Sequence, residues 1–292
     1  MHTLSMLMSA DLVFSYTFLL CVIAYACAIP TYFFIRKNSP KLNWHRHGNT
    51  CTSQFNQLDI FGVGLFLLIF GATLTLAQAP PELGPDGNPK EIRMTPSIML
   101  VGMISQQIVF TLIVFALMMF RGTNFGDLLG LNPSKVVRIL VVSMLGFAAF
   151  YIFGVGLHIL GYEEWLKNIF GSDYKVQETI KTFQATDAAT IRIMMAFTVA
   201  ILAPLCEEVL FRGYIYGATK RFSDRFFACL FSSLLFAVVH YNINALIPLF
   251  FLAIVLTIAY ELTGSIWAPI IIHALVNANT LIMIEFGNAT AN

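Results

Sequence analysis

Long apolar runs alternate with shorter polar segments along the 292-residue chain. A helix needs about 20 residues to cross a bilayer, and eight runs reach or approach that length, the sixth being the shortest. These predicted spans are residues 12–34, 60–79, 98–120, 139–160, 191–216, 226–241, 245–262 and 265–286. The runs are continuous and do not alternate with a period of two, which excludes a β-barrel. We therefore expect an all-α, polytopic transmembrane helical bundle with about eight spans.

Composition agrees with this fold class and limits the partners. The chain is 58% hydrophobic and 11% charged, with a mean hydropathy of +0.75, which excludes a soluble globular protein. The formal net charge of +1, without a basic cluster, gives no indication of nucleic-acid binding. The five cysteines have no metal-type spacing and predict neither a zinc finger nor a disulfide framework. The lipid bilayer is thus the first expected partner.

The loops predict how the chain is placed in the membrane. Lys and Arg are in excess in the loops after the first, third and fifth spans, which predicts that both termini lie outside. The long connection 162–190 mixes acidic and aromatic residues, a pattern typical of amphipathic helices at the interface. We expect residues 1–190 to form N-terminal helices with loops and this interfacial segment. Residues 191–292 would form the core that carries the chemistry, within one integrated membrane domain.

The segment 204–212 places two adjacent acids and an arginine inside an apolar run. Ionisable groups at membrane depth are costly and usually functional. Glu208 and Arg212 are four residues apart, share a helix face and are expected to form an ion pair. Glu207 points about 100° away on the helix and has no local partner. It therefore predicts either a protonated side chain or a partner on another helix.

Two histidines in other spans are candidate partners of Glu207. His240 lies near the end of the sixth predicted span, and His273 lies inside the eighth, with Asn277 one turn later. At about 1.5 Å of rise per residue, these groups fall in a similar layer of the membrane. A single intramembrane histidine is usually an interhelical hydrogen-bond donor, but a glutamate, two histidines and an asparagine at one depth favour a shared site.

These residues form three short motifs in a fixed order. The motifs are Glu207-Glu208-x-x-x-Arg212, Phe236-x-x-x-His240 and His273-x-x-x-Asn277. Together they resemble the motifs of the CAAX-protease and bacteriocin-processing family of intramembrane peptidases, and the resemblance covers about residues 191–286. It implies a helical membrane core with a water-filled cavity open to the cytoplasm, in a multi-pass protein of the bacterial plasma membrane. It also implies endopeptidase activity on prenylated proteins or on leader peptides.

No serine or cysteine is paired with a base in the motifs, so activated water is the expected nucleophile. In this hypothesis Glu207 is the general base, assisted by His240, and His273 with Asn277 would stabilise the oxyanion. Glu208, Arg212 and Phe236 would support the site. A metal alternative remains open, in which Glu207, His240 and His273 hold Zn²⁺ and Glu208 is the base. The cofactor is thus either absent or a divalent metal.

Two other function classes fit the same sequence. A non-enzymatic immunity or scaffold protein could keep the fold without the activity. An ion-coupled transporter could use carboxylates and histidines as a relay, although the polar groups all cluster in the last third of the chain. The expected substrate of the peptidase is a peptide or lipidated protein within the membrane.

Overall fold

The computed structural model describes residues 9–39, 48–79, 95–119, 122–131, 136–171 and 178–291. Across these ranges every regular element is a helix, as the sequence predicts. Seven helices are long and apolar enough to cross a membrane. They are α2 (Ala10–Asn38), α3 (Leu58–Ala77), α4 (Pro96–Met119), α6 (Val136–Ile159), the run Ala189–Arg221, α13 (Leu246–Thr263) and α14 (Trp267–Ala291).

The sixth predicted span corresponds to a shorter helix, α12 (Arg225–Val238), of 14 residues. At about 1.5 Å per residue it reaches only about 21 Å, less than the ~30 Å hydrocarbon core. Its first turn is capped by Asp224, whose side chain accepts from the backbone N–H groups of Phe226 and Phe227. α12 packs against α13 and α2, so it completes the bundle as a shorter eighth apolar helix.

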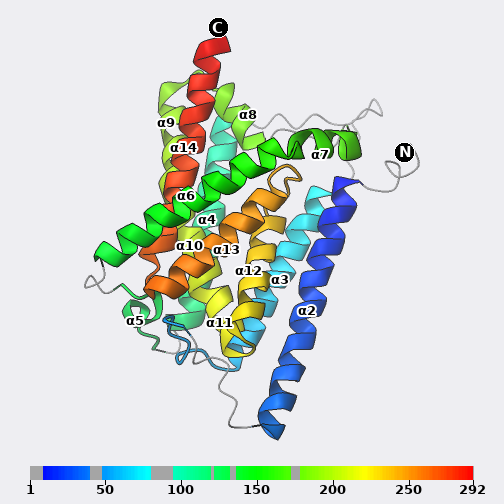
Figure 1. The fold of residues 1–292 in the computed structure, drawn as a ribbon, viewed down its shortest axis with the longest axis vertical. Coiled ribbons are helices and arrows are strands. Elements are labelled where there is room, and N and C mark those ends of the chain that lie inside the picture. Colours follow the sequence, from blue (N-terminus) through cyan, green and yellow to red (C-terminus); the bar gives the residue numbers. More distant parts are fainter. Residues whose placement is uncertain are drawn as a thin grey trace.

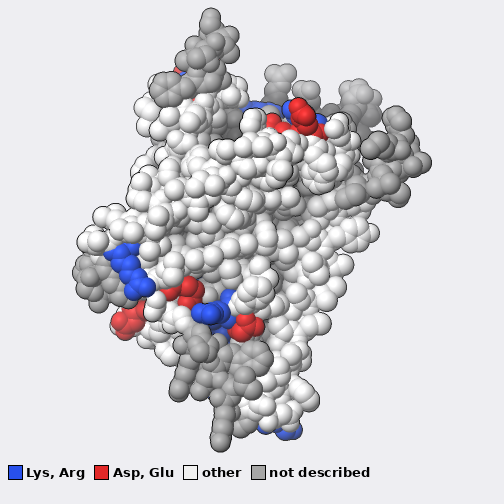
Figure 2. Space-filling view, in the orientation of Figure 1, with Lys and Arg blue, Asp and Glu red and all other residues white. Residues whose placement is uncertain are grey.

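The outer surface of the bundle is apolar over a broad band. Figure 2 shows a white zone between charged groups that gather towards the two ends of the molecule. Large apolar side chains on the long helices α3 and α6 are exposed, for example Phe61 at 74%, Leu68 at 74% and Ile152 at 73%. A lipid environment explains such exposure, because apolar side chains there lose nothing by facing outward. The chain is therefore a multi-pass membrane protein.

Short helices lie at both ends of the bundle. α5 (Phe125–Leu129) lies at one end, whereas α7 (Tyr162–Phe170) and α8 (Glu178–Gln184) lie at the other, beside the start of α2 and the end of α14 (Figure 1). The connection 162–190 thus contains two helices, as its pattern predicts. In α7, Leu166 and Phe170 are buried while Glu163 and Glu164 are exposed, which is an amphipathic arrangement.

A buried ion pair fixes the end of the bundle that carries α5. The Lys220 ammonium, which is fully buried, donates to Glu261 Oε1. The same oxygen accepts from Tyr216 Oη at 2.6 Å and from Thr50 Oγ1 at 2.5 Å. Asn49 Nδ2 donates to the Glu261 carbonyl at 3.0 Å. The segment after α2 is therefore held by hydrogen bonds to α13 and to the helix that ends at Arg221.

The burial of this ion pair leads to a prediction about the free energy of unfolding. Lys220→Met leaves the Glu261 carboxylate without its cation in a mostly buried site. We expect the free energy of unfolding to fall by about 2–4 kcal/mol, since removing one partner of a buried pair is strongly destabilising. The double variant Lys220→Met/Glu261→Gln should lose clearly less than the sum of the single changes.

Denaturant unfolding of the purified protein in detergent measures these changes. Arg138→Met is the matched control, because Arg138 is exposed on α6, and it should leave the unfolding curve unchanged. Equal stability of Lys220→Met and the parent protein would contradict the prediction.

Candidate functional site

The helix Ala189–Arg221, here called the Glu207 helix, is one run of 33 residues with a changing hydrogen-bond pattern. Two π-helical segments, η4 (Thr198–Leu202) and η5 (Val209–Tyr216), flank the α-helical segment α10 (Ala203–Glu208). π-helical turns are rare and occur frequently at functional sites. Both acids are the last two residues of α10, so irregular backbone borders them on each side.

A proline explains why the first π-helical segment receives a hydrogen bond from another helix. The Ala203 N–H donates to the Thr198 carbonyl, five residues earlier. The next residue is Pro204, which has no N–H, so the Val199 carbonyl lacks the equivalent donor. Asn277 of α14 replaces it, since its Nδ2 donates to the Val199 carbonyl at 2.9 Å. Asn277 therefore joins α14 to the Glu207 helix just before the two acids.

Glu208 and Arg212 form the ion pair that their spacing predicts. Arg212 Nη1 donates to Glu208 Oε1 at 2.9 Å, and the two side chains are 1% and 0% exposed. Arg212 Nη2 also donates to the Ala253 carbonyl of α13 at 3.2 Å. The same oxygen of Glu208 lies 2.9 Å from His273 Nδ1 on α14. The pair thus links three helices and fixes one nitrogen of an imidazole ring.

Glu207 lies beside this pair but faces a different set of groups. Its Oε2 is 3.8 Å from His273 Nε2 and 3.9 Å from His240 Nε2. Its Oε1 accepts from Gln107 Nε2 of α4 at 2.9 Å. The Glu207 and His240 side chains are 17% and 23% exposed, whereas His273 is 3% exposed. The Glu207 and His240 side chains are therefore partly accessible from outside, whereas the His273 side chain is buried.

The position of His240 depends on an unusual residue after it. His240 follows the end of α12, and its Nδ1 lies 2.6 Å from the Phe236 carbonyl. Tyr241 has φ 47°, a left-handed conformation that costs a non-glycine residue about 1–3 kcal/mol. Contacts with α2 hold it there: its ring packs on Phe14 at 4.8 Å, and its hydroxyl bonds to Asp11. The N-terminal helix thus helps to turn the chain at His240.

Phe236 packs between the charged and the imidazole groups. Its ring is fully buried and lies 4.7 Å from the Arg212 guanidinium carbon, within range of a cation–π interaction. It also lies 4.6 Å from the His240 ring and 5.7 Å from the His273 ring. One aromatic side chain therefore separates the ion pair from His240 and keeps both imidazoles in place.

The hydrogen bonds determine which nitrogens face Glu207. Each imidazole has its Nδ1 beside an acceptor, the Phe236 carbonyl for His240 and the Glu208 carboxylate for His273. Nδ1 therefore carries the proton in the neutral rings, and both Nε2 atoms are acceptors. Three acceptor atoms, one oxygen and two nitrogens, therefore converge, and none of them carries a proton to donate to another. The arrangement is suited to a species that brings its own protons, such as water.

The metal alternative was tested on the same side chains. Within the described ranges, no group of three His, Cys, Asp or Glu side chains is arranged to hold a metal ion. Glu207, His240 and His273 thus do not form a preformed cluster of metal ligands within these ranges.

The structure brings most of the predicted residues together, and it adds one that the sequence reasoning missed. Apart from Asn277, whose contact is with Val199, each motif residue touches another motif residue. Gln107 was not anticipated, because it lies in a span outside the motifs. The available signal was the polar pair Gln106-Gln107 in the middle of an otherwise apolar run.

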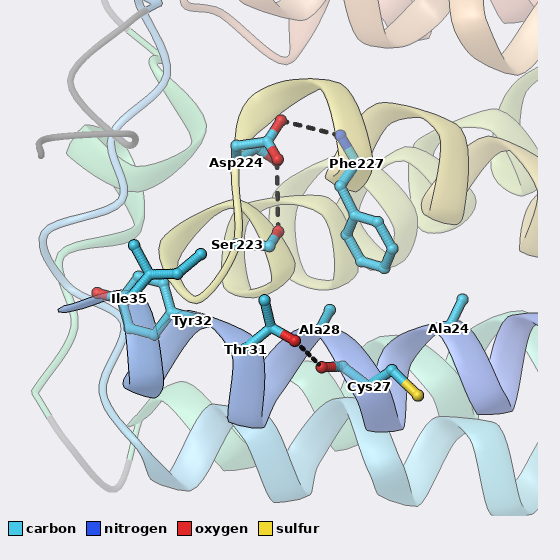
Figure 3. A pocket seen from close by; sticks show the side chains of 9 residues that line it. All are labelled: Ala24, Cys27, Ala28, Thr31, Tyr32, Ile35, Ser223, Asp224 and Phe227. Carbon is cyan, nitrogen blue, oxygen red and sulfur yellow. Dashed lines mark hydrogen bonds between the residues drawn. The ribbon is translucent and has the colours of Figure 1, made fainter. Parts of the chain in front are cut away.

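Two cavities lie away from these side chains. One, of about 810 Å³, lies between α2 and α3. The other, of about 380 Å³, lies between α2 and the start of α12, where Cys27, Thr31 and Tyr32 face Ser223 and Phe227 (Figure 3). Neither is lined by a motif residue, so the Glu207 site is separate from both.

The contact between Asn277 and Val199 leads to a second prediction about the free energy of unfolding. Asn277→Ala leaves a carbonyl without a donor, and we expect a loss of about 1–3 kcal/mol in unfolding free energy. Pro204→Ala in the same chain supplies a backbone N–H, so the double variant should recover most of that loss. Denaturant unfolding in detergent measures both changes, and Pro204→Ala alone is the control. A double variant no more stable than Asn277→Ala would contradict this account of the proline.

Comparisons with known proteins agree with the motifs. Residues 189–279 match the family described as Type II CAAX prenyl endopeptidase Rce1-like. The chain is 30% identical over 115 residues to "Putative membrane peptidase YdiL" of Bacillus subtilis (strain 168), covering 39% of this chain and 46% of that protein. It is 28% identical over 198 residues to "Membrane-embedded CAAX protease MroQ" of Staphylococcus aureus (strain USA300), covering 65% and 76%. No solved structure matches the chain.

The chain thus spans about half the length of YdiL and three quarters of MroQ. The family match begins at the first residue of the Glu207 helix and ends just after Asn277, so it contains all three motifs. The resemblance predicted from the motifs is confirmed over this part of the chain, since residues 189–279 match the Rce1-like family model.

Proposed function

We propose that the protein is an intramembrane endopeptidase in which Glu207 activates a water molecule. The observation that carries this proposal is the convergence of Glu207 Oε2 with the Nε2 atoms of His240 and His273, at 3.9 and 3.8 Å. A water that donates one proton to the carboxylate and the other to an imidazole nitrogen pairs with two of these three acceptors. Its oxygen is then directed away from them, where a substrate carbonyl can approach.

The reaction is hydrolysis of a peptide bond. Glu207 takes a proton from water while the water oxygen bonds to the carbonyl carbon, with His240 orienting the water. The same proton passes to the amide nitrogen as the carbon–nitrogen bond breaks. The products are a new carboxyl end and a new amine end. General acid–base catalysis of this kind contributes about 10²–10⁴-fold in rate.

We assign the stabilisation of the oxyanion to His273. Its Nδ1 faces the Glu208 carboxylate, and its Nε2 would donate to the oxyanion in the form of the ring that carries a proton on both nitrogens. The Glu208–Arg212 pair therefore acts through His273, much as the carboxylate of a Ser-His-Asp triad supports its histidine. Asn277 was predicted as a second oxyanion donor. Because its amide donates to Val199, we assign it to holding α14 against the Glu207 helix.

The proposed substrate is a peptide or lipidated protein that reaches the site within the membrane. Support comes from the apolar surroundings of the site and from the family description, which names a prenyl endopeptidase. Lys and Arg are in excess towards the end that carries α5 and α11 (Gly217–Arg221), and we propose that this end faces the cytoplasm. The active-site recess would then be entered from the cytoplasmic side.

Substitution of Glu207 separates the peptidase from the two other function classes. Glu207→Gln keeps the shape of the side chain but removes the base, so cleavage should fall by about 10²-fold or more. His240→Ala should also lower the rate, because the water loses its second acceptor. Purified protein in detergent is incubated with lipidated and leader-type peptides, and products are identified by mass spectrometry.

Glu164→Gln is the matched control for this experiment. It makes the same chemical change at an exposed position of α7 and should cleave at the parent rate. Wild-type cleavage by Glu207→Gln would rule out the proposed base. If no peptide class is cleaved by any variant, the scaffold or transporter alternatives are favoured.

Metal removal provides an independent prediction. In the mechanism proposed here Glu207 activates the water directly, so cleavage should persist after exhaustive treatment with a strong chelator. Metal analysis of the treated sample verifies the removal, and a known zinc peptidase treated in parallel should lose its activity. Loss of cleavage that returns on addition of Zn²⁺ would instead favour the two-histidine, one-glutamate zinc site.

A further inference from the structure

Gln107 of α4 donates a hydrogen bond to the Glu207 carboxylate. Its Nε2 donates to Glu207 Oε1 at 2.9 Å. The residue lies outside the family match at residues 189–279, and the three motifs do not include it. α4 packs along α10 and along both π-helical segments beside it. The N-terminal half of the chain therefore contributes a group that touches the proposed catalytic base.

A carboxylate at the end of a glutamate needs such a contact to keep a fixed orientation. The last torsion of a glutamate side chain is broad and roughly two-fold, so the plane of the two oxygens is poorly defined by its own geometry. A donor on one oxygen fixes that plane and leaves the second oxygen in a set direction. Here the donor is on Oε1, and the second oxygen, Oε2, is the one that faces both imidazoles.

We propose that Gln107 is a positioning residue that orients Glu207 towards water and the two imidazoles. This inference rests on the proposed function, because it assigns a role within the same reaction. Gln107 donates to one oxygen of the base, whereas water is activated at the other. Loss of the donor lets the carboxylate rotate, which lowers the fraction of enzyme molecules in the reactive geometry. Substrate binding is unaffected, since Gln107 contacts the base and not the substrate.

A simple interhelical hydrogen bond is the competing explanation. Intramembrane glutamines commonly join helices in this way, and α4 would then only be anchored to α10. The two explanations differ in a measurable way. An anchoring role changes the amount or stability of folded protein, but it leaves the turnover of each folded molecule unchanged. A positioning role lowers kcat while KM stays the same.

The experiment compares Gln107→Met with Gln106→Met. Methionine has nearly the length and volume of glutamine but no N–H donor. Gln106 is its neighbour on α4 and is exposed, so it is a matched control for residue type, helix and membrane depth. For each variant, kcat and KM are measured on the same cleaved peptide, normalised to folded protein, together with an unfolding curve.

We expect Gln107→Met to lose about 10–100-fold in kcat with unchanged KM, as for the loss of a hydrogen bond to a charged group. Gln106→Met should match the parent protein. A parent-like kcat for Gln107→Met, whether or not its stability falls, overturns the inference. Glu207→Gln, measured in parallel, separates the two failures: if it cleaves normally the proposed function fails, and if it is inactive only the role of Gln107 is rejected.

Discussion

The ion pair between Glu208 and Arg212 imposes the strictest constraint on this structure, because both charges are almost completely removed from solvent. Taking a carboxylate and a guanidinium out of water costs several kcal/mol for each ion unless the partners and further hydrogen bonds compensate. The compensation comes from three other helices: the Ala253 carbonyl on α13, the Phe236 ring on α12 and His273 on α14. The C-terminal helices are thus arranged around a charge pair, and the imidazole of His273 is fixed as a consequence.

Two adjacent glutamates acquire different chemistry from this arrangement. Glu208 has a cation and an imidazole N–H as partners, so its charge is neutralised, and we assign it a supporting role. Glu207 points about 100° away on the helix and has only a neutral donor, Gln107, and the unprotonated sides of two rings. Glu208 Oε1 is occupied by Arg212 and His273, whereas Glu207 Oε2 faces the two imidazoles from a side chain that is partly exposed. The proposed division into a supporting acid and a reacting acid therefore follows from position on one helix.

Much of this could be predicted from the sequence, because the signals are local. The apolar runs predicted the helices, the spacing of Glu208 and Arg212 predicted the ion pair, and the motifs predicted the match to the family model. Other features depend on contacts between residues distant in sequence. The donor from Gln107 to Glu207 joins positions 100 residues apart, and the contact of Tyr241 with Asp11 joins positions 230 apart. The bond from Asn277 to Val199 was hidden because it depends on a π-helical turn, which has no reliable sequence pattern.

These distant contacts bear on how the N-terminal helices contribute to function. The sequence predicts that residues 191–292 carry the chemistry, and residues 1–188 lie outside the family match. Yet α4 touches the base at Gln107, and α2 holds the strained turn that follows His240 through Phe14 and Asp11. A small shift of α2 or α4 would move the carboxylate or an imidazole without changing any motif residue. Because a misplacement of about 1 Å can cost as much as 10²-fold in rate, the packing of these two helices should set the activity of the site as strongly as the motifs do.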